Sequence, residues 1–482
     1  MDMALIENIA LLSAHVVFTF ALGYYSISAF QWYAYRFERV FFHYHRYDWH
    51  LFFFLLPIFM YYASGFYFIF FLVFVYLPML YFWQKKLDKK LVFTSRVKRF
   101  FLFLLLATFF QNILCLTLPS CVRYGVLLPL FVSLFISSLF EKILFSGYKK
   151  MAKKKLQAKS DMIIIAITAS YGKTSIKNFL YQILSHRYKC YATPRSVNTL
   201  GGIIKDINED LPQDTQIYIV EAGARARGDI DEIAQLINPH YVIIGQIGEQ
   251  HIEYFKTLQN IRDTKMELIN SSNLKKAFVH VSAKTTANEK IILFGDALQK
   301  VDATLDGISF TCKLDDQSID FFAPVLGSFH AVNLLACLHV SLELMDLASI
   351  QKALTALQST PHRLQKIQAR GKLIIDDSFN GNFDGMLASY ELAKTYEGRK
   401  VLITPGIIES TPQANANLAK KIDLIFDLVI ITGKSNQKIL DANITRAEKI
   451  ILKDKSALQQ TLQDCTFSGD LILFSNDTPA FM

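Results

Sequence analysis

The residues with the clearest chemical content are I-T-A-S-Y-G-K-T-S at 167–175, where a lysine and two hydroxyl side chains follow a glycine. The β-branched run at 162–168 predicts a buried strand that leads into them, and a helical pattern follows. At a strand–loop–helix junction, backbone N–H groups and the helix dipole face a bound anion. Lys173 would then reach the outer phosphates of a nucleotide, and the Thr174 hydroxyl would bind Mg²⁺. The strict phosphate-loop pattern fails because Ile167 replaces its first glycine, so a merely exposed lysine after a turn is the alternative.

Three further side chains lie where a nucleotide site would need them. Glu221 ends an apolar run and His251 follows another, at 241–247, and ligands bind at the carboxyl ends of strands in α/β sheets. A carboxylate and an imidazole at that edge could hold a cation beside the phosphates. Lys265 follows on a predicted helix, in T-K-M-E at 264–267. Taken alone, His251 would more often be structural, and Lys265 would be a solvated lysine with a glutamate nearby.

Alternating elements position these residues. From residue 161 onward, short β-branched runs alternate with longer helical stretches, which is typical of parallel α/β architecture. A break at S-T-P, 359–361, divides the pattern into two α/β domains, at 160–355 and 360–482. The expected strands are residues 162–168, 217–220, 241–247 and 277–281 in the first domain, and 372–375, 401–404, 428–432, 450–452 and 471–474 in the second.

Residues 1–148 have a different composition. The chain is 52% hydrophobic, contains 40 Phe and has only 19% charged residues, which excludes disordered and fibrous classes. Much of the apolar content lies in four uncharged runs, at 8–35, 51–83, 100–122 and 124–140. About 20 apolar residues cross a bilayer, so these runs predict an α-helical membrane region. The long second run could break at Ser64-Gly65, so the region allows four or five transmembrane helices.

Basic residues indicate how the chain is oriented. Lysine and arginine gather at 85–99 and at 149–159, directly after predicted spans, and cytoplasmic loops carry this excess. We therefore expect a multi-pass protein of the inner membrane whose soluble part lies in the cytoplasm, with contacts to membrane lipid. This interpretation explains the formal net charge of +9 better than a nucleic-acid partner does. The six cysteines form no C-x-x-C pair, so neither a zinc site nor a disulfide framework is expected.

Eight short motifs occur in order between residues 168 and 382. They are T-A-S-Y-G-K-T-S at 168–175, T-P-R-S-V-N-T at 193–199, V-E-A-G-A at 220–224, Q-I-G-E-Q-H-I-E at 246–253, Lys265, G-S-F-H-A-V-N at 327–333, P-H-R at 361–363 and D-D-S-F-N-G-N at 376–382. In kind and order this set resembles the Mur ligases, ATP-dependent amide-bond ligases of peptidoglycan precursor synthesis. The last motif is typical of the member that adds D-alanyl-D-alanine.

The resemblance implies a fold and a set of site residues. It implies a P-loop central ATPase domain and a Rossmann-like C-terminal domain, with ATP and Mg²⁺ as cofactors. Lys173, His251 and Lys265 would be catalytic, with Lys265 carbamylated. The nucleotide would contact Ser170, Gly172, Lys173, Thr174, Ser175, Asn333 (at the adenine), Arg363 and Asp377. The metal ions would be held by Thr174, Glu221, His251 and Lys265, and the substrates by Asn198, Thr199, Asn380 and Asn382.

Departures from the family leave the acceptor open. Ala169 replaces the usual glycine of the loop, Gln246 replaces an asparagine and Phe383 a proline. The family's N-terminal domain for the UDP-sugar is missing, and the membrane region occupies its place. The leading hypothesis is a ligase that joins D-alanyl-D-alanine to a UDP-N-acetylmuramoyl tripeptide through an acyl phosphate.

Three other hypotheses stand beside it. A ligase for another carboxylate, on a lipid-linked precursor or a polyglutamate, is the alternative enzyme. A nucleotide-binding regulator of a membrane channel is the non-enzymatic one. Association with other cell-wall synthesis enzymes is a further hypothesis about partners.

Overall fold

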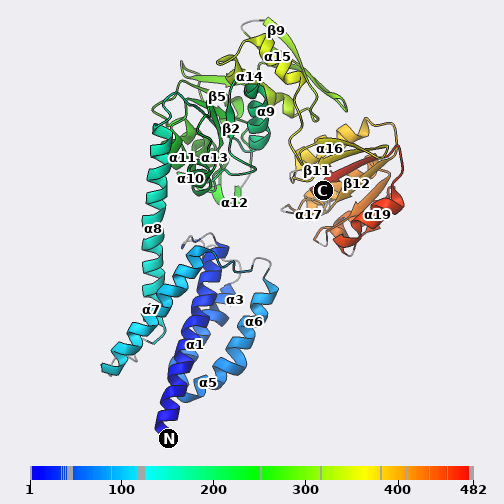
Figure 1. The fold of residues 1–482 in the computed structure, drawn as a ribbon. Helices are drawn as coiled ribbons and strands as arrows, with labels where there is room; N and C mark the ends of the chain where they lie inside the picture. The colour runs from blue at the N-terminus through cyan, green and yellow to red at the C-terminus, as the bar shows by residue number, and fades with distance from the viewer. Residues whose placement is uncertain are drawn as a thin grey trace. The chain divides into compact units, whose positions relative to one another are not determined.

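The structure is a computed structural model (Figure 1). It describes residues 3–33, 35, 37, 40, 47–87, 90–117, 125–249, 252–314, 317–379, 381, 383–408, 410–433, 435–452 and 454–476. The chain divides into two compact units, Met1–Gly147 and Tyr148–Met482.

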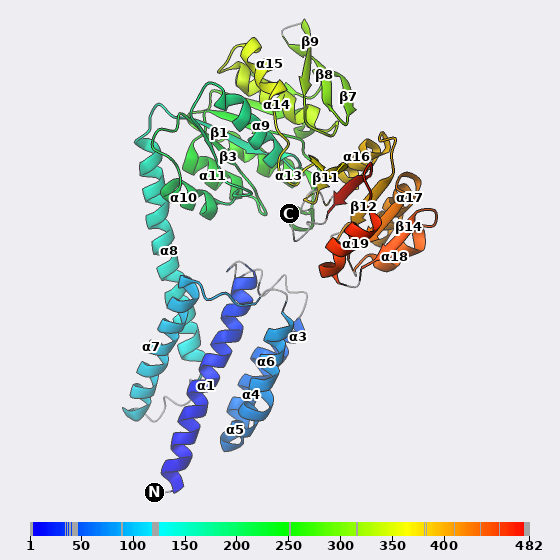
Figure 2. The ribbon, with the colours of Figure 1, turned by 45° about the vertical axis from the view of Figure 1, so that its right-hand side comes forward.

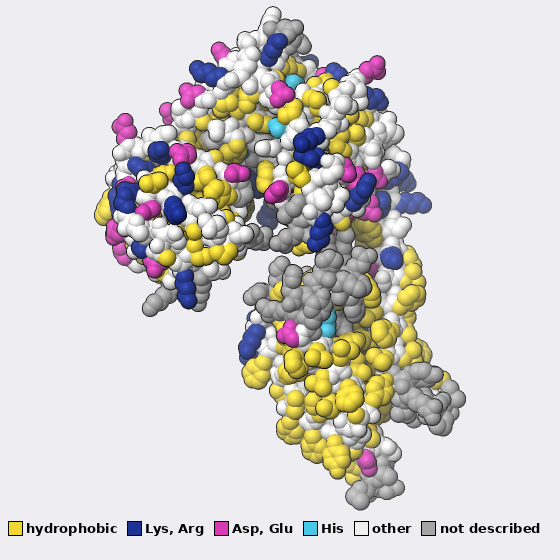
Figure 3. Space-filling model, turned by 180° about the vertical axis from the view of Figure 1, so that it is seen from behind, with side chains coloured by type: hydrophobic (Ala, Val, Ile, Leu, Met, Phe, Trp, Pro, Cys, Tyr) yellow, Lys and Arg dark blue, Asp and Glu magenta, His cyan; other side chains and the backbone are white. Residues whose placement is uncertain are grey.

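The N-terminal unit is made of apolar helices. Its elements are α1 (Met3–Trp32), α3 (Tyr47–His50), η1 (Leu51–Leu55), α4 (Leu56–Ala63), η2 (Gly65–Tyr67), α5 (Phe68–Phe71), η3 (Leu72–Tyr76), α6 (Leu77–Lys86), α7 (Ser95–Thr117) and most of α8 (Leu127–Gln157). Large apolar side chains such as Phe74, Phe110 and Phe135 are exposed on them, and Figure 3 shows this hydrophobic surface. A continuous apolar surface of this kind suits lipid better than water.

Among the described residues, four helices are long and apolar enough to cross a membrane. They are Ile6–Trp32, Gly65–Lys86, Ser95–Leu114 and Leu127–Gln157. A fifth, shorter helical arm at 47–63 precedes the second of them, because the longest apolar run folds back at Ser64, where the sequence predicted a break. The two arms are antiparallel, and the Tyr76 hydroxyl of one donates a hydrogen bond to the Phe53 carbonyl of the other (3.0 Å).

A six-stranded parallel sheet forms the central domain of the second unit. Its order is β2-β3-β1-β4-β5-β6, with β1 (Ile163–Thr168), β2 (Cys190–Ala192), β3 (Ile217–Glu221), β4 (Tyr241–Ile244), β5 (Lys276–His280) and β6 (Ile291–Phe294). Apolar residues occupy both faces of β1, which suits a central strand covered on both sides. On one face pack α9 (Lys173–Ser185), α14 (His330–Leu342) and α15 (Leu347–Thr355); on the other pack α10 (Leu200–Glu209), α11 (Asp229–Ile237) and α13 (Leu258–Met266) (Figure 2).

The last turns of α8 belong to the core of this domain. Ala152 and Leu156 are buried among residues of β1, α10 and α11, and the Asn208 side chain donates a hydrogen bond to the Tyr148 carbonyl (3.0 Å). The core of the central domain therefore begins before residue 160, within a helix that the sequence placed in the membrane region.

The C-terminal domain is a second α/β sandwich. Its sheet has the order β10-β11-β15-β12-β13-β14, with β10 antiparallel and the others parallel. The strands are β10 (Gln365–Ala369), β11 (Lys372–Asp377), β12 (Lys400–Thr404), β13 (Leu428–Ile431), β14 (Glu448–Ile451) and β15 (Leu471–Ser475). The helices are α16 (Phe383–Lys394), α17 (Pro412–Ile425), α18 (Gln437–Asn443) and α19 (Leu458–Cys465).

Several strands escaped the sequence analysis. They are β2, β6 and β10, together with the antiparallel sheet of β7 (Leu298–Thr304), β8 (Gly307–Leu314) and β9 (Gln317–Ala323). β2, β6 and β10 lie at sheet edges, and polar residues interrupt the apolar runs of β7, β8 and β9. Hydrogen bonding to neighbours, rather than local pattern, makes them strands.

Candidate active site

The phosphate loop has the predicted context. It connects β1 to α9, whose first residue is Lys173. Gly172 caps the helix with φ +81°, a conformation that favours glycine, and a Cβ at this position would lie 2.5 Å from Oδ1 of Asn333. The Lys173 ammonium donates to the carbonyls of Ala169 (2.7 Å) and Ser170 (3.2 Å). The loop is thus closed around the lysine that would meet a phosphate.

The segment after β4 packs against the loop. The Ser170 N–H donates to the Gln246 carbonyl (2.8 Å), and the Ser170 hydroxyl donates to the Gly248 carbonyl (2.9 Å). Ala169 is buried, and a Cβ on Gly245 would lie 2.9 Å from its methyl group. The alanine that departs from the family pattern is therefore accommodated because the facing residue is a glycine.

Glu221 is the hub of the site. Its carboxylate, at the end of β3, accepts hydrogen bonds from the Thr174 hydroxyl (3.0 Å) and from Nδ2 of Asn198 (3.1 Å). The structure thus brings together three residues that the sequence named at separate positions. A hydroxyl and a carboxylate supply the hard oxygen donors that Mg²⁺ prefers, so Thr174 and Glu221 fit a metal beside the nucleotide phosphates.

Lys177 is a member of the site that the sequence analysis missed. Its ammonium lies 3.5 Å from Glu221 and donates to the carbonyls of Thr193 (2.7 Å) and Arg195. It therefore ties α9 to the segment that carries Asn198. The signal was present, since a lysine on the apolar face of a predicted helix needs a buried partner, but a local pattern does not say which one.

Lys265 is buried near the end of α13, with 5% of its surface exposed. Burial lowers its pKa well below the usual range, and the positive charge of Lys173 lowers it further. The neutral amine is the form that adds CO₂, so this environment fits a carbamate. A carbamate would place another oxygen ligand in the site.

Arg363 and Asp377 come from the C-terminal domain and its linker. Burial lowers the pKa of Arg363, while the Asp377 and Glu221 carboxylates act in the opposite direction. Oδ1 of Asp377 accepts a hydrogen bond from the Leu364 N–H (3.2 Å), which fixes the turn that carries the arginine. Arg363 thus lies close enough to Glu221 of the central domain for the two charges to act on each other.

The remaining predicted residues have varied positions. Nδ2 of Asn333 donates to Nδ1 of His330 (3.1 Å), so the other end of this amide faces the loop at Gly172. Burial lowers the pKa of His330 to about 3, which keeps it neutral as the acceptor. Ser175 is buried inside α9, and Thr199 caps α10 by accepting from the Gly202 N–H (3.3 Å). His251, Asn380 and Asn382 lie outside the described residues.

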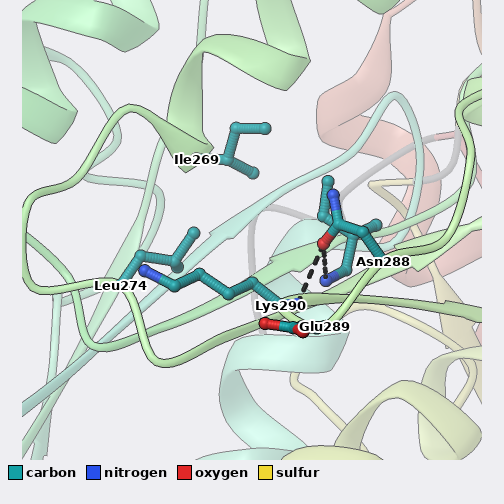
Figure 4. Close-up of a pocket in the computed structure, with 6 residues that line it drawn as sticks. Ile269, Leu274, Asn288, Glu289 and Lys290 are labelled. Carbon is teal, nitrogen blue, oxygen red and sulfur yellow. Dashed lines mark hydrogen bonds between the residues drawn. The ribbon is translucent and has the colours of Figure 1, made fainter.

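A hollow of about 390 Å³ lies elsewhere on the central domain. It is lined by Ile269, Leu274, Asn288, Glu289, Lys290 and Ile291, and the Asn288 side chain accepts from two backbone N–H groups there (Figure 4). These residues precede β5 and β6, except Ile291, which begins β6. The hollow is therefore at the amino ends of the strands, away from the edge where α/β sheets bind ligands.

Residues 167–341 match the model of the Mur ligase middle domain. The chain is an ATP-dependent ligase of the Mur type. A UDP-N-acetylmuramoyl-tripeptide–D-alanyl-D-alanine ligase of Bacillus subtilis is 27% identical to it over 354 residues, which are 68% of this chain and 76% of that relative. ATP and Mg²⁺ are the cofactors of this ligase type, so the expected cofactors and enzyme class are confirmed.

Solved structures show the same fold. MurF of Thermotoga maritima in complex with ADP superposes on this Mur-type ligase with a TM-score of 0.58 and 21% identity, covering 69% of this chain and 80% of that one. The UDP-N-acetylmuramoylalanyl-D-glutamyl-2,6-diaminopimelate–D-alanyl-D-alanyl ligase of Acinetobacter baumannii gives a TM-score of 0.61 and 22% identity, covering 69% and 76%. The expectation of a central P-loop-type domain followed by a C-terminal α/β domain is confirmed.

Proposed function

We propose that the enzyme joins D-alanyl-D-alanine to the peptide carboxylate of a UDP-N-acetylmuramoyl tripeptide. The names of the relatives support this choice of substrates. The structural observation that carries the reaction type is the hydrogen bond from Thr174, at the start of α9, to Glu221, at the end of β3, with Lys265 buried on α13. The reaction brings two anions together, a carboxylate and a triphosphate, and a cation held by these residues would offset their repulsion.

The chemistry requires an activated carboxylate. A carboxylate does not react with an amine near neutral pH, but transfer of the γ-phosphoryl group of ATP converts it into an acyl phosphate. The amine then attacks the acyl carbon, and inorganic phosphate leaves. Mg²⁺ held by Thr174 and Glu221 would offset the phosphate charge. Lys173 and Arg363 bring positive charge from the central domain and from the C-terminal side, which stabilises the negative charge of the transferring group.

The test is the substrate requirement for phosphate release. Purified enzyme in detergent should release phosphate from ATP only when both an acceptor and D-alanyl-D-alanine are present, and mass spectrometry should find the pentapeptide product. Release with ATP alone would favour a nucleotide-driven regulator and would overturn the proposal.

A second acceptor deserves a parallel assay because of the N-terminal unit. Four helices with the length and composition of membrane spans precede the Mur-type ligase, and a lipid-linked tripeptide would reside in the same bilayer. Product formation from the lipid-linked acceptor but not from the UDP-linked one would select this alternative. Polyglutamate belongs in the same assay.

We place the enzyme in the inner membrane with its catalytic part in the cytoplasm. The apolar helices and the basic segments at 85–99 and 149–159 support this location. Contacts with anionic lipid and with other cell-wall synthesis enzymes are expected there.

A further inference from the structure

The loop after β3 carries two arginines that the reaction described above does not use. Arg225 and Arg227 follow Glu221 by four and six residues, and both side chains are exposed. Within the described part of the chain, neither guanidinium forms an ion pair or a hydrogen bond. Two unpaired cations therefore lie on the loop that leaves the hub of the active site.

The backbone of this loop is held in place by two carboxylates. Oδ2 of Asp229 accepts from the N–H groups of Arg225 and Ala226 (both 2.9 Å). The Glu267 carboxylate accepts from the Gly228 N–H through both oxygens (2.9 and 3.0 Å). Glu267 follows Lys265 by two residues, so the arginine loop is tied at one end to Glu221 and at the other to the segment that carries Lys265.

We infer that Arg225 and Arg227 form a subsite for the free carboxylates of the acceptor peptide. This inference rests on the proposed function, because a peptide of the alanyl-D-glutamyl-diaminopimelate type has a free carboxylate on the glutamyl residue and a second one on diaminopimelate, close to the carboxylate that reacts. Arginine suits this task, since its planar guanidinium pairs with a carboxylate through two parallel hydrogen bonds.

The reach of the loop favours peptide carboxylates over the diphosphate of the carrier. Four residues span at most about 14 Å, so Arg225 lies near Glu221. The diphosphate is separated from the reacting carboxylate by three residues and a sugar, which is more than about 15 Å when extended. The central domain would therefore recognise the peptide itself, whichever carrier it is attached to.

The experiment crosses variants of the protein with variants of the acceptor. Arg225→Gln and Arg227→Gln should raise KM for the tripeptide acceptor about tenfold or more, as expected for loss of a charge-assisted pair, and should leave KM for ATP unchanged. An acceptor amidated on its glutamyl carboxylate should have the same raised KM with wild type as with the variant that lacks the arginine pairing with that carboxylate. An acceptor with lysine in place of diaminopimelate tests the other carboxylate in the same way.

Controls separate this effect from misfolding. Arg370→Gln removes an exposed arginine from the β10–β11 turn, at the far edge of the C-terminal sheet, and should change neither constant. Unfolding temperature and ATP affinity of each variant should match wild type, and Arg225→Lys should recover part of the loss.

Two results would overturn the subsite. One is an unchanged KM for the acceptor in both arginine variants. The other is an arginine substitution that raises KM by the same factor for the free acceptor and for the amidated one. Either can occur while wild type still makes the ligated product, so the proposed function would survive. If wild type does not ligate the tripeptide on any carrier, both ideas are wrong.

Discussion

The pKa of Lys173 links nucleotide binding to pH at the scale of a single residue. Burial lowers it to about 8; the Glu221 carboxylate opposes this shift and the Arg363 guanidinium adds to it. The ammonium form attracts phosphate and the neutral amine does not. A lysine in this position is therefore charged near neutral pH and loses its charge in mildly basic solution.

We expect the affinity for ATP to be full below about pH 8 and to fall as the pH rises above it. A single required proton gives a decrease of up to about tenfold per pH unit. Dissociation constants at pH 7 and pH 9, with proton uptake measured by calorimetry in two buffers, check this. Lys173→Arg stays charged at both pH values and should flatten the profile. A wild-type profile as flat as that of the variant would contradict the assignment.

The pair Ala169 and Gly245 makes a second prediction at this scale. Gly245→Ala places a methyl group 2.9 Å from that of Ala169, and overpacking of this kind costs about 1–3 kcal/mol. Urea unfolding should show the loss, and the double variant Ala169→Gly with Gly245→Ala should regain part of it. A double variant as unstable as Gly245→Ala alone would show that the two positions do not compensate each other.

At the scale of elements, α8 serves two environments. Its first part is an apolar helix with the composition of a membrane span, and its last turns bury Ala152 and Leu156 in the central domain. Burying one leucine side chain contributes about 1.5–3 kcal/mol. The end of α8 is thus part of the catalytic fold.

We predict that a chain of residues 148–482 binds ATP like the whole protein, whereas one of residues 161–482 is less stable. The shorter chain loses the packing of Ala152 and Leu156 and should unfold several degrees lower, since 1 kcal/mol is worth about 2–4 °C in a domain of this size. Leu156→Ala in the longer chain should reproduce part of the decrease. Equal unfolding temperatures for the two chains would contradict this role for α8.

At the scale of the whole molecule, the five apolar helical segments that the structure describes in the N-terminal unit, at 3–32, 47–63, 65–86, 95–117 and 127–147, alternate in direction (Figure 1). Gln31 near the end of α1 donates to the Val92 carbonyl before α7 (2.8 Å), and Arg99 at the start of α7 pairs with Glu141 of α8 (2.6 Å). These contacts lie at one end of the unit, together with most of its lysine and arginine. At the other end the described residues 3–7, 64–65 and 125–126 contain no lysine or arginine.

This asymmetry predicts that the start of α1 faces the outside of the cell. An odd number of passes puts the two ends of the unit on opposite sides, and the basic end is cytoplasmic. In a protein with Cys115 and Cys121 replaced by serine, Glu7→Cys should react with a membrane-impermeant thiol reagent in intact cells, and Lys90→Cys should react only after permeabilisation. Protection of both cysteines in intact cells would mean four passes, and the reverse result would mean the opposite orientation.

The sequence alone predicted the motifs and the ends of the central strands, because both depend on local residue patterns. The phosphate loop at 167–175 and Glu221 were named because a parallel sheet places its ligands after strands, and apolar runs reveal the strands. Lys265 lies on a helix, and the resemblance supplied its role. Lys177 and the accommodation of Ala169 were not found, since each depends on a partner far along the chain, Glu221 in one case and Gly245 in the other. The edge strands β2 and β10 were missed for the same reason.

The sequence by itself determined the class of this protein: an apolar helical region followed by a two-domain ligase of the Mur type, with its phosphate loop and its hub carboxylate. These features are set by periodicity, composition and short motifs, which act over a few residues. Only the tertiary structure decided that the apolar run at 51–83 turns back on itself and that α8 ends inside the catalytic core. It also decided that Arg225 and Arg227 occupy a loop tied to Glu267. Packing between distant segments settles such features, because burial and hydrogen bonding depend on which side chains meet after the chain has folded.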